Sequence, residues 1–345
     1  MTKLKLALAG GLSAVALFAT ANAALAAGEL HIFNWGEYTN PALIAKFEKA
    51  YDVKVTVDEY DSNETMLAKV RAGHSGYDIV VPGDYAVKIM IEEGLLAETR
   101  PNEMPNFKNI EARFVDVYWD AGRNYTTPWT HGLTTFAVNT DAYKGPADSI
   151  ALLFDPPEEL KGRIAMLDDM VSIIHAAERY VGVPRCTSDR EELKKVYDAL
   201  MKAKPYWRTY SVDSINKLVS GEADVAQTWS GSAVVVRQQL ASVKFALTKE
   251  VMEAFSDNVA VLKDAPNLEN AKLFQNFVMD PENAALTSDF AGYANAIKGS
   301  AAFFSADLKA APELNVPADA ATEFVPPCSA EVTALYNAMW TELRR

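Results

Sequence analysis

Short hydrophobic runs alternate with amphipathic segments along the chain after residue 27. In the segment that begins at Pro41, Leu43, Phe47 and Tyr51 recur at the spacing of one helical face. Strands that alternate with helices through short connections indicate an α/β fold with a mostly parallel sheet covered by helices on both sides. The predicted elements, in the order strand, helix, strand, helix, strand and helix, are Leu30–Phe33, Pro41–Tyr51, Val53–Val57, Glu64–Ala72, Asp78–Val81 and Ala86–Glu93.

A second α/β series follows the proline-containing loop Asp155–Pro157. We expect two further strands, Thr134–Asn139 and Asn258–Leu262, to carry the chain between two lobes. The length of 345 residues agrees with two lobes, since one domain typically has about 100 to 200 residues. The other predicted strands are Arg163–Leu167 and Ala223–Thr228, and the predicted helices are Val171–Val181, Arg190–Lys202, Val212–Val219, Asn267–Met279 and one that starts at Pro281.

The first 26 residues have the pattern of an export signal that is removed from the mature protein. Lys3 and Lys5 form a basic start, residues 6–18 are mostly apolar, and small residues precede the expected cleavage after Ala26. A second possible cleavage site follows Ala23. A membrane anchor is the alternative, but the apolar run is shorter than the roughly 20 residues that span a bilayer. We therefore predict an exported protein with a signal peptide at residues 1–26.

The charge balance restricts the partners. The chain has 33 Lys and Arg against 46 Asp and Glu, a formal net charge of −13. Nucleic acids and anionic membranes are recognised by basic patches, so we expect neither as a partner. A cationic partner is compatible with this balance.

Motifs of common catalytic and metal sites are missing from the sequence. His31, His74, His131 and His175 are scattered without metal-ligand spacing. The Trp229–Ser232 segment resembles a nucleophile turn but has Thr228 where G-x-S-x-G requires glycine. Glycine-rich nucleotide loops are also lacking. We expect no cofactor and no enzymatic activity; the alternative, a secreted hydrolase, would need a nucleophile or metal that the sequence does not offer.

Cys186 and Cys328 are the only cysteines, and both belong to the part of the chain that would be exported. An oxidising compartment permits a disulfide between them, although sequence alone does not show that they lie within bridging distance. The alternative is two separate buried thiols.

Aromatic residues stand beside carboxylates at the predicted ends of several strands. In open α/β sheets, ligands bind outside the carboxyl ends of the strands. Aromatic faces attract cations, and carboxylates accept charge-assisted hydrogen bonds from ammonium groups. Taken singly, these residues are more often core aromatics or helix caps, and only their recurrence predicts a site for a cationic amine. The residues are Trp35, Glu37, Tyr38, Asp84, Tyr85, Asp168, Asp169, Trp229, Phe255 and Asp257.

Five segments together resemble the periplasmic spermidine/putrescine-binding proteins of bacterial ABC importers. They are His31–Tyr38, Tyr60–Met66, Tyr77–Pro82, Trp229–Ala233 and Gly292–Ala296, and the resemblance covers essentially the whole mature chain. It implies a type II, two-lobed periplasmic fold that closes on a polyamine or diamine and delivers it to an inner-membrane permease. We expect a monomeric receptor in the periplasm, with lobe 1 at 27–135 plus about 260–305 and lobe 2 at 136–259 plus about 306–345.

The resemblance also implies roles for individual residues. Aromatic side chains would surround the methylene chain and the ammonium groups, carboxylates would pair with the nitrogens, and a serine would add a hydroxyl contact. The aromatic residues are Trp35, Tyr38, Tyr85, Trp229, Phe255 and Tyr293, the carboxylates are Glu37, Asp169 and Asp257, and the serine is Ser211.

Several positions depart from the family pattern. Gly83 stands where the family usually has serine, Ser172 where it often has an acid, and Pro326 with Pro327 where glutamine is expected. Phe255 in place of tryptophan is more similar to the putrescine-preferring branch. These differences favour a shorter or differently charged amine than spermidine.

Two other receptor classes would need residues that the sequence lacks. An amino-acid or opine receptor should present arginine to the ligand carboxylate, and the signature loops contain none. A ferric-ion receptor of similar architecture would need paired tyrosines, and the chain has no Tyr-Tyr pair. A receptor for another cationic amine stays open.

Overall fold

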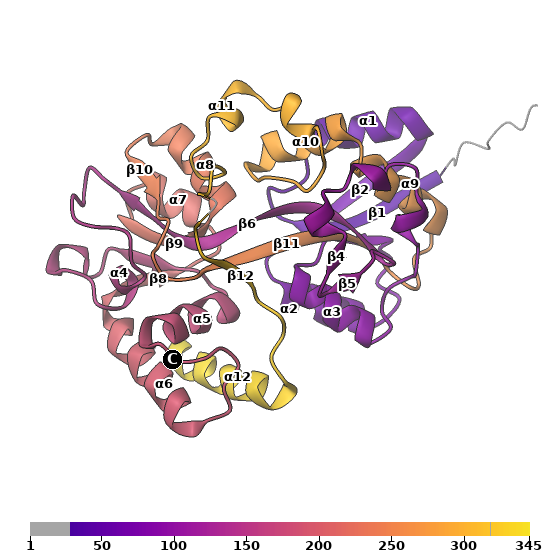
Figure 1. The fold of residues 1–345 in the computed structure, drawn as a ribbon. Coiled ribbons are helices and arrows are strands. Elements are labelled where there is room, and N and C mark those ends of the chain that lie inside the picture. Colours follow the sequence, from indigo (N-terminus) through magenta and orange to yellow (C-terminus); the bar gives the residue numbers. More distant parts are fainter. Residues whose placement is uncertain (1–27, 318) are drawn as a thin grey trace, which may run out of the picture.

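The computed structural model describes residues 28–317 and 319–345, so the predicted signal peptide lies outside the described residues. Its main feature is one curled sheet in which two long antiparallel strands, β6 (Thr126–Asn139) and β11 (Met252–Val261), lie side by side. Figure 1 shows both strands running from one half of the molecule to the other. The full strand order is β2-β1-β3-β11-β6-β9-β7-β8, with β10 on β6 and β12 on β11.

Parallel strands form each half of the sheet. In the first half, β1 (Gly28–Trp35) pairs in parallel with both β2 (Val53–Tyr60) and β3 (Ile79–Val80). In the second half, β7 pairs in parallel with β8 and β9. This arrangement confirms the predicted mostly parallel α/β class. The remaining strands are β4 (Asp116–Val117), β5 (Asp120–Ala121), β7 (Ile164–Met166), β8 (Trp207–Tyr210), β9 (Val225–Trp229), β10 (Val243–Phe245) and β12 (Thr322–Phe324).

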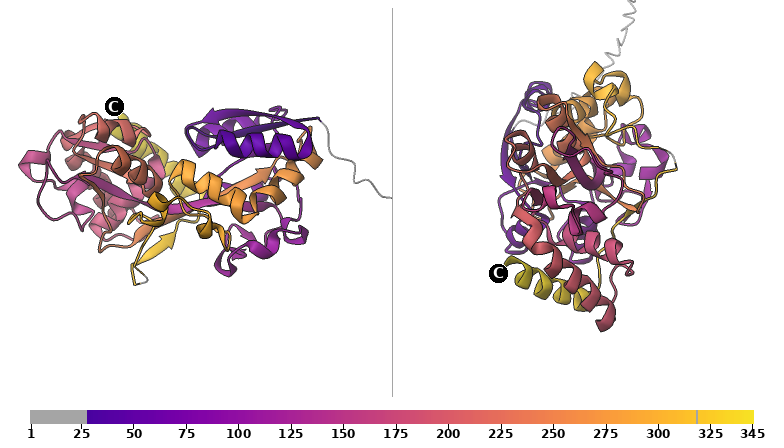
Figure 2. Two further views of the ribbon diagram at one scale, coloured as in Figure 1. Left: turned by 90° about the horizontal axis from the view of Figure 1, so that it is seen from above. Right: turned by 90° about the vertical axis from the view of Figure 1, so that its left-hand side faces the viewer.

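Helices cover both faces of each half, which gives the molecule two lobes joined by β6 and β11 (Figure 2). The first-lobe helices are α1 (Pro41–Tyr51), α2 (Asn63–Arg71), α3 (Asp84–Glu92), α9 (Leu268–Val278) and α10 (Pro281–Ala291). The others are α4 (Ala151–Phe154), α5 (Met170–Val181), α6 (Arg190–Ala203), α7 (Ser214–Val219), α8 (Ser230–Gln239), α11 (Ala306–Lys309) and α12 (Ala330–Arg344). Within the described residues, none of these helices is both long and apolar enough to cross a membrane.

Separate hydrophobic cores mark where the strands pass from lobe to lobe. Trp129 of β6 packs in the same core as α1 and α9, whereas Phe136 packs with α5 and α6. On β11, Val259 already belongs to the first-lobe core. The crossing therefore lies near residues 130–135 and 253–258. The predicted crossing strands at 134–139 and 258–262 were too short and placed too late, because the polar residues of the crossing hide the strand pattern. The exact lobe limits stay a prediction.

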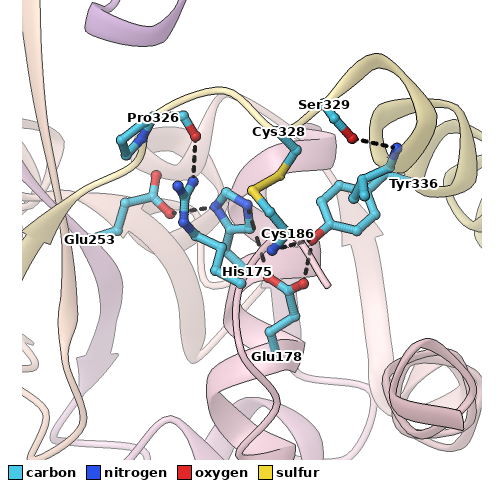
Figure 3. Close-up of a disulfide and its surroundings, with 10 residues drawn as sticks. His175, Glu178, Cys186, Glu253, Pro326, Cys328, Ser329 and Tyr336 are labelled. Carbon is cyan, nitrogen blue, oxygen red and sulfur yellow. Dashed lines mark hydrogen bonds and ion pairs between the residues drawn. A yellow bond between two sulfur atoms is a disulfide. The ribbon is translucent and has the colours of Figure 1, made fainter. Parts of the chain in front are cut away.

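Cys186 and Cys328 form a disulfide bond (Figure 3). The bond ties the loop after α5 to the segment that leads into α12. Tyr336 of α12 donates a hydrogen bond to Glu178 of α5, and the Cys186 N–H donates to the Tyr336 hydroxyl at 3.1 Å. The C-terminal helix is thus fastened to α5, and the N-cap of α5 is Asp169, one of the predicted ligand residues.

Candidate ligand-binding site

A buried tyrosine and a buried aspartate from distant parts of the chain form the centre of the site. The Tyr38 hydroxyl donates a 2.7 Å hydrogen bond to Oδ2 of Asp257 and also contacts the hydroxyl of Thr130. Asp257 lies where the pairing register of β11 and β6 shifts, between Ser256 and Asn258. Burial raises the pKa of the Asp257 carboxyl to about 7, although the Tyr38 hydrogen bond acts in the opposite direction.

Aromatic rings pack around the hydrogen-bonded Tyr38 and Asp257. The Tyr293 ring meets Tyr38 edge-on at 5.4 Å and Phe255 at 5.8 Å between centroids. Trp229, at the end of β9, packs against the same hydrophobic core. Tyr293 fits because residue 231 is glycine: a Cβ there would come within 2.4 Å of the ring. Three of the predicted aromatic residues therefore form one cluster that reaches Asp257 through Tyr38, and Trp229 lies in the same hydrophobic core.

A second buried carboxylate, Asp84, belongs to the aromatic and carboxylate pattern of the sequence, although the family resemblance assigned it no role. It is the first residue of α3 and is only 3% exposed. It accepts hydrogen bonds from the Tyr85 N–H at 2.6 Å, the Tyr118 hydroxyl at 3.1 Å and the Ser256 N–H at 3.2 Å. Burial nevertheless raises its pKa to about 8, and the charge of Asp257 acts in the same direction.

The third carboxylate of the site, Asp169, belongs to the second lobe. Asp169 caps α5 in the second lobe and accepts a 2.7 Å hydrogen bond from the Ser172 N–H. Burial, followed by the charge of Glu64 on α2 of the first lobe, raises the pKa of Asp169 to about 7. Tyr85 donates a 3.0 Å hydrogen bond to Glu64. Burial and the charges of Glu64 and Asp169 raise the pKa of Tyr85 well above its usual value. The charge of Asp169 thus acts across the lobes on Tyr85.

These carboxylates have no positive partner in the part of the chain that the structure describes. Among the described residues, no Lys, Arg or His nitrogen lies within 4.0 Å of the carboxylates of Asp84, Asp169 or Asp257. The neighbouring Glu253 is different, because Arg179 lies 3.6 Å from it and His175 3.8 Å. Desolvated carboxylates without a counterion are costly, and a cation bound beside them relieves that cost.

Three other predicted site residues are Trp35, Glu37 and Ser211. Trp35 donates its indole N–H to the Val81 carbonyl at 2.9 Å, and its ring lies 4.8 Å from that of Tyr60. Glu37 is exposed and adopts a left-handed backbone conformation with φ of 57°. The Ser211 hydroxyl accepts a hydrogen bond from the Asp213 N–H at 3.0 Å. The roles predicted for these three residues stay predictions.

Two of the positions that depart from the family pattern, Gly83 and Ser172, lie beside the candidate site residues. Gly83 forms a β-bridge with Asp257, and its N–H donates to Oδ1 of Asn63 at 3.1 Å. A Cβ at Gly83 would lie 3.1 Å from Nδ2 of Asn63. Ser172 donates its hydroxyl to Glu253 at 3.3 Å. A buried acid therefore lies next to the position where the family often has one.

Fold and site together define a two-lobed solute-binding protein with the type II periplasmic-binding architecture. The chain belongs to the bacterial extracellular solute-binding protein family, whose model matches residues 42–316. This confirms both the predicted fold class and the receptor class.

Individual relatives agree with this assignment. The spermidine/putrescine-binding periplasmic protein of Escherichia coli is 32% identical over 267 residues, covering 76% of each chain. The putrescine-binding periplasmic protein PotF, also from Escherichia coli, is 31% identical over 340 residues and 92% of each chain. A solved structure from Listeria monocytogenes, assigned to a spermidine/putrescine ABC transporter, superposes with a TM-score of 0.86 at 28% identity. That match covers 92% of this chain and 98% of the other.

Proposed function

We propose that the protein is a periplasmic receptor that binds a linear diamine or polyamine without catalysis and delivers it to an inner-membrane ABC permease. The names of the curated relatives support the ligand class and the compartment. The pattern of residues 1–26 supports export.

One observation carries the proposal: Asp84 and Asp257 are buried and Asp169 is partly buried, yet none of the three carboxyl groups has a cationic partner in the described part of the chain. An ammonium group beside such a carboxylate gains a charge-assisted hydrogen bond and restores local neutrality. The rings of Tyr38 and Tyr293 offer faces and edges that suit an alkyl chain and its cationic ends. An anionic or neutral ligand would leave the burial cost of the carboxylates in place.

The acidic residues fall into two groups, which favours a ligand with two nitrogen ends. Asp84 accepts a hydrogen bond from the N–H of Ser256, the residue before Asp257, whereas Asp169 lies at the start of α5 in the second lobe. Gly83 adds no side-chain hydroxyl beside Asp257. We therefore rank a diamine such as putrescine or cadaverine above spermidine.

Isothermal titration calorimetry of the ligand-stripped protein tests the proposal. The ligands are putrescine, cadaverine, spermidine, agmatine and common amino acids. We expect one-to-one binding of a diamine and no heat from amino acids. Absence of both binding heat and a thermal shift with every di- and polyamine at millimolar concentration would overturn the proposal.

Lobe closure about β6 and β11 gives an independent readout. Because Asp169 belongs to the second lobe and Tyr85 to the first, a ligand held by both requires the lobes to approach. Solution scattering should give a smaller radius of gyration with saturating putrescine. Identical curves would contradict closure.

A further inference from the structure

Asp257 stands on an irregular stretch of β11, between two residues that are fully buried. The pairing register with β6 shifts between Ser256 and Asn258, and a shift of this kind redirects the side chain that lies within it. Asn258 closes the irregularity, because its Nδ2 donates to the Ser256 carbonyl at 2.7 Å. The direction of the Asp257 carboxylate therefore depends on how firmly the side chain of Asn258 is held.

Arg123 holds the other end of the Asn258 amide. Its Nη1 donates to Oδ1 of Asn258 at 2.6 Å, and the indole N–H of Trp119 donates to the same oxygen at 3.2 Å. The guanidinium is anchored in turn through Nε, which donates to the Phe114 carbonyl at 2.7 Å. Because 135 positions separate Arg123 from Asn258, this link is a tertiary contact and does not follow from the strand itself.

The surroundings of Arg123 are unfavourable for an arginine. Its side chain is fully buried, and no carboxylate of the described chain lies within 4.0 Å of the guanidinium. Its Nη2 has no hydrogen-bond partner among the described residues. Burial lowers its pKa to about 10, against the charge of Asp120, and its backbone is left-handed with φ of 57°. A desolvated cation on a strained backbone persists only where the surrounding structure enforces it, and such positions cluster at functional sites.

The segment that carries Arg123 also reaches the other neighbour of Asp257. Tyr118, in the turn between β4 and β5, donates its hydroxyl to Asp84 at 3.1 Å. Asp84 in turn accepts the Ser256 N–H at 3.2 Å. Residues on both sides of Asp257 are thus held, directly or through one side chain, by the same short segment of the first lobe.

We propose that Arg123 is a positioning residue for ligand binding: through Asn258 it fixes the direction in which Asp257 presents its carboxylate to an ammonium group. The inference rests on the proposed function and deepens it. A loosened Asn258 would let the carboxylate leave the geometry set by its bond to Tyr38. Charge-assisted hydrogen bonds weaken when their distance and angle are lost, so ligand affinity would fall although no ligand contact is removed.

The test places Arg123→Lys in two backgrounds, the wild type and Asp257→Asn. Lysine keeps the positive charge, but its single nitrogen cannot reproduce the fork that serves separate acceptors together. Arg113→Lys is the matched control, because Arg113 is exposed and pairs with Glu111 at 3.0 Å. Calorimetry with putrescine at up to millimolar concentration measures affinity, and thermal unfolding of the ligand-free variants measures stability.

We expect Arg123→Lys to weaken putrescine binding at least tenfold in the wild-type background and less than twofold in Asp257→Asn. Arg113→Lys should change the affinity less than twofold. A loss below twofold for Arg123→Lys in the wild-type background would overturn the inference, whatever the change in melting temperature. An equal fold-loss in both backgrounds would also overturn it, since Arg123 would then not act through Asp257. Failure of the wild-type protein to bind any amine would instead remove the proposed function.

Trp119→Phe decides the question if Arg123→Lys does not fold. Phenylalanine keeps an aromatic ring beside Phe324 but removes the N–H that donates to Asn258. We expect at least a threefold loss of putrescine affinity when Asp257 is present and no measurable loss in the Asp257→Asn background. An unchanged affinity with Asp257 present, or the same loss in both backgrounds, would overturn the inference.

Discussion

Tyr38 and Asp257 are joined by a 2.7 Å hydrogen bond although 219 residues separate them in the chain. The bond occupies Oδ2 of the carboxylate and orients the group. Oδ1 faces Gly83, where a Cβ would stand 3.6 Å away. Because the tyrosine comes from the loop after β1 and the aspartate from β11, the pair ties the first lobe to the crossing strands at the point where the ligand is expected.

Asp257→Asn should abolish tight amine binding. The substitution keeps the size of the side chain but removes the charge that would pair with a buried ammonium group. Loss of one partner of such a pair costs roughly 3 to 5 kcal/mol, so the affinity for putrescine should fall by a factor of about one hundred or more. Calorimetry measures this loss, and the melting temperature of the ligand-free variant checks the fold. Unchanged putrescine affinity would show that Asp257 does not pair with the ligand.

Amine binding should release protons near neutral pH. In the empty site the pKa values of Asp169 and Asp257 are raised to about 7 by burial, so both groups are partly protonated at pH 7. A bound ammonium favours the ionised form and lowers these pKa values. Putrescine affinity should therefore rise between about pH 6 and pH 8.

Titrations in two buffers with different ionisation enthalpies count the protons released. At pH 7 we expect a net release, which is smaller in Asp257→Asn because one of the titrating groups is gone. An observed enthalpy that does not depend on the buffer, together with an affinity that is flat between pH 6 and pH 8, would contradict this coupling.

Asp84 should make the ligand-free protein less stable as the pH rises. Its pKa is about 8 in the fold against 3.8 for a free aspartate, so the folded state keeps a proton that the unfolded state has lost. Between these values the free energy of unfolding falls with increasing pH. Asp84→Asn removes the titrating group, and its stability should change less between about pH 5 and pH 8. Urea unfolding at several pH values measures the slopes, and equal slopes in both proteins would contradict the assignment.

Local periodicity predicted the first lobe well, because its helices have one apolar face and clear ends. The predicted bounds of Pro41–Tyr51 agree with α1, where Asn40 accepts the capping hydrogen bond and Pro41 begins the helix. Helices α8 and α12 were missed. In α8 buried positions surround much of the helix, so no single apolar stripe stands out. In α12, Tyr336 and Leu343 pack on the second lobe through contacts that follow only from the tertiary fold.

The aromatic side of the site was predictable, whereas its full set of carboxylates was not. Trp229, Phe255 and Tyr293 belong to recognisable motifs, and in the structure they share one hydrophobic core with Tyr38, the hydrogen-bond partner of Asp257. Asp84 was visible beside Tyr85 in the sequence, but its burial depends on β11, which is far away in the chain.

Gly231→Ala should weaken amine binding through Tyr293. Residue 231 lies in α8, where alanine is intrinsically favoured over glycine by about 1 kcal/mol. The new Cβ would come within 2.4 Å of the Tyr293 ring, so the ring must shift relative to its present contacts with Tyr38 and Phe255. We expect at least a tenfold loss of putrescine affinity.

Ser232→Ala is the matched control for that substitution, because it removes only a 3.4 Å contact to the Tyr293 hydroxyl and leaves the ring in place. Its affinity should stay within about threefold of the wild type. Equal effects of the two substitutions would show that the ring position does not govern binding.

Removal of the disulfide should lower stability while leaving amine affinity nearly unchanged. Cys186 and Cys328 are 142 residues apart in sequence, so their bond restricts a long loop of the unfolded chain, with a stabilisation of up to about 5 kcal/mol on chain-entropy grounds. The bond fastens α12 to the end of α5, whereas Asp169 lies at the start of α5. The Cys186→Ser/Cys328→Ser double variant should therefore melt several degrees lower than the oxidised protein and bind putrescine within about twofold of it. Thermal unfolding with and without a reductant, together with calorimetry, measures both effects. An equal melting temperature would contradict the stabilising role, and a large loss of affinity would show that the fastening of α12 also positions Asp169.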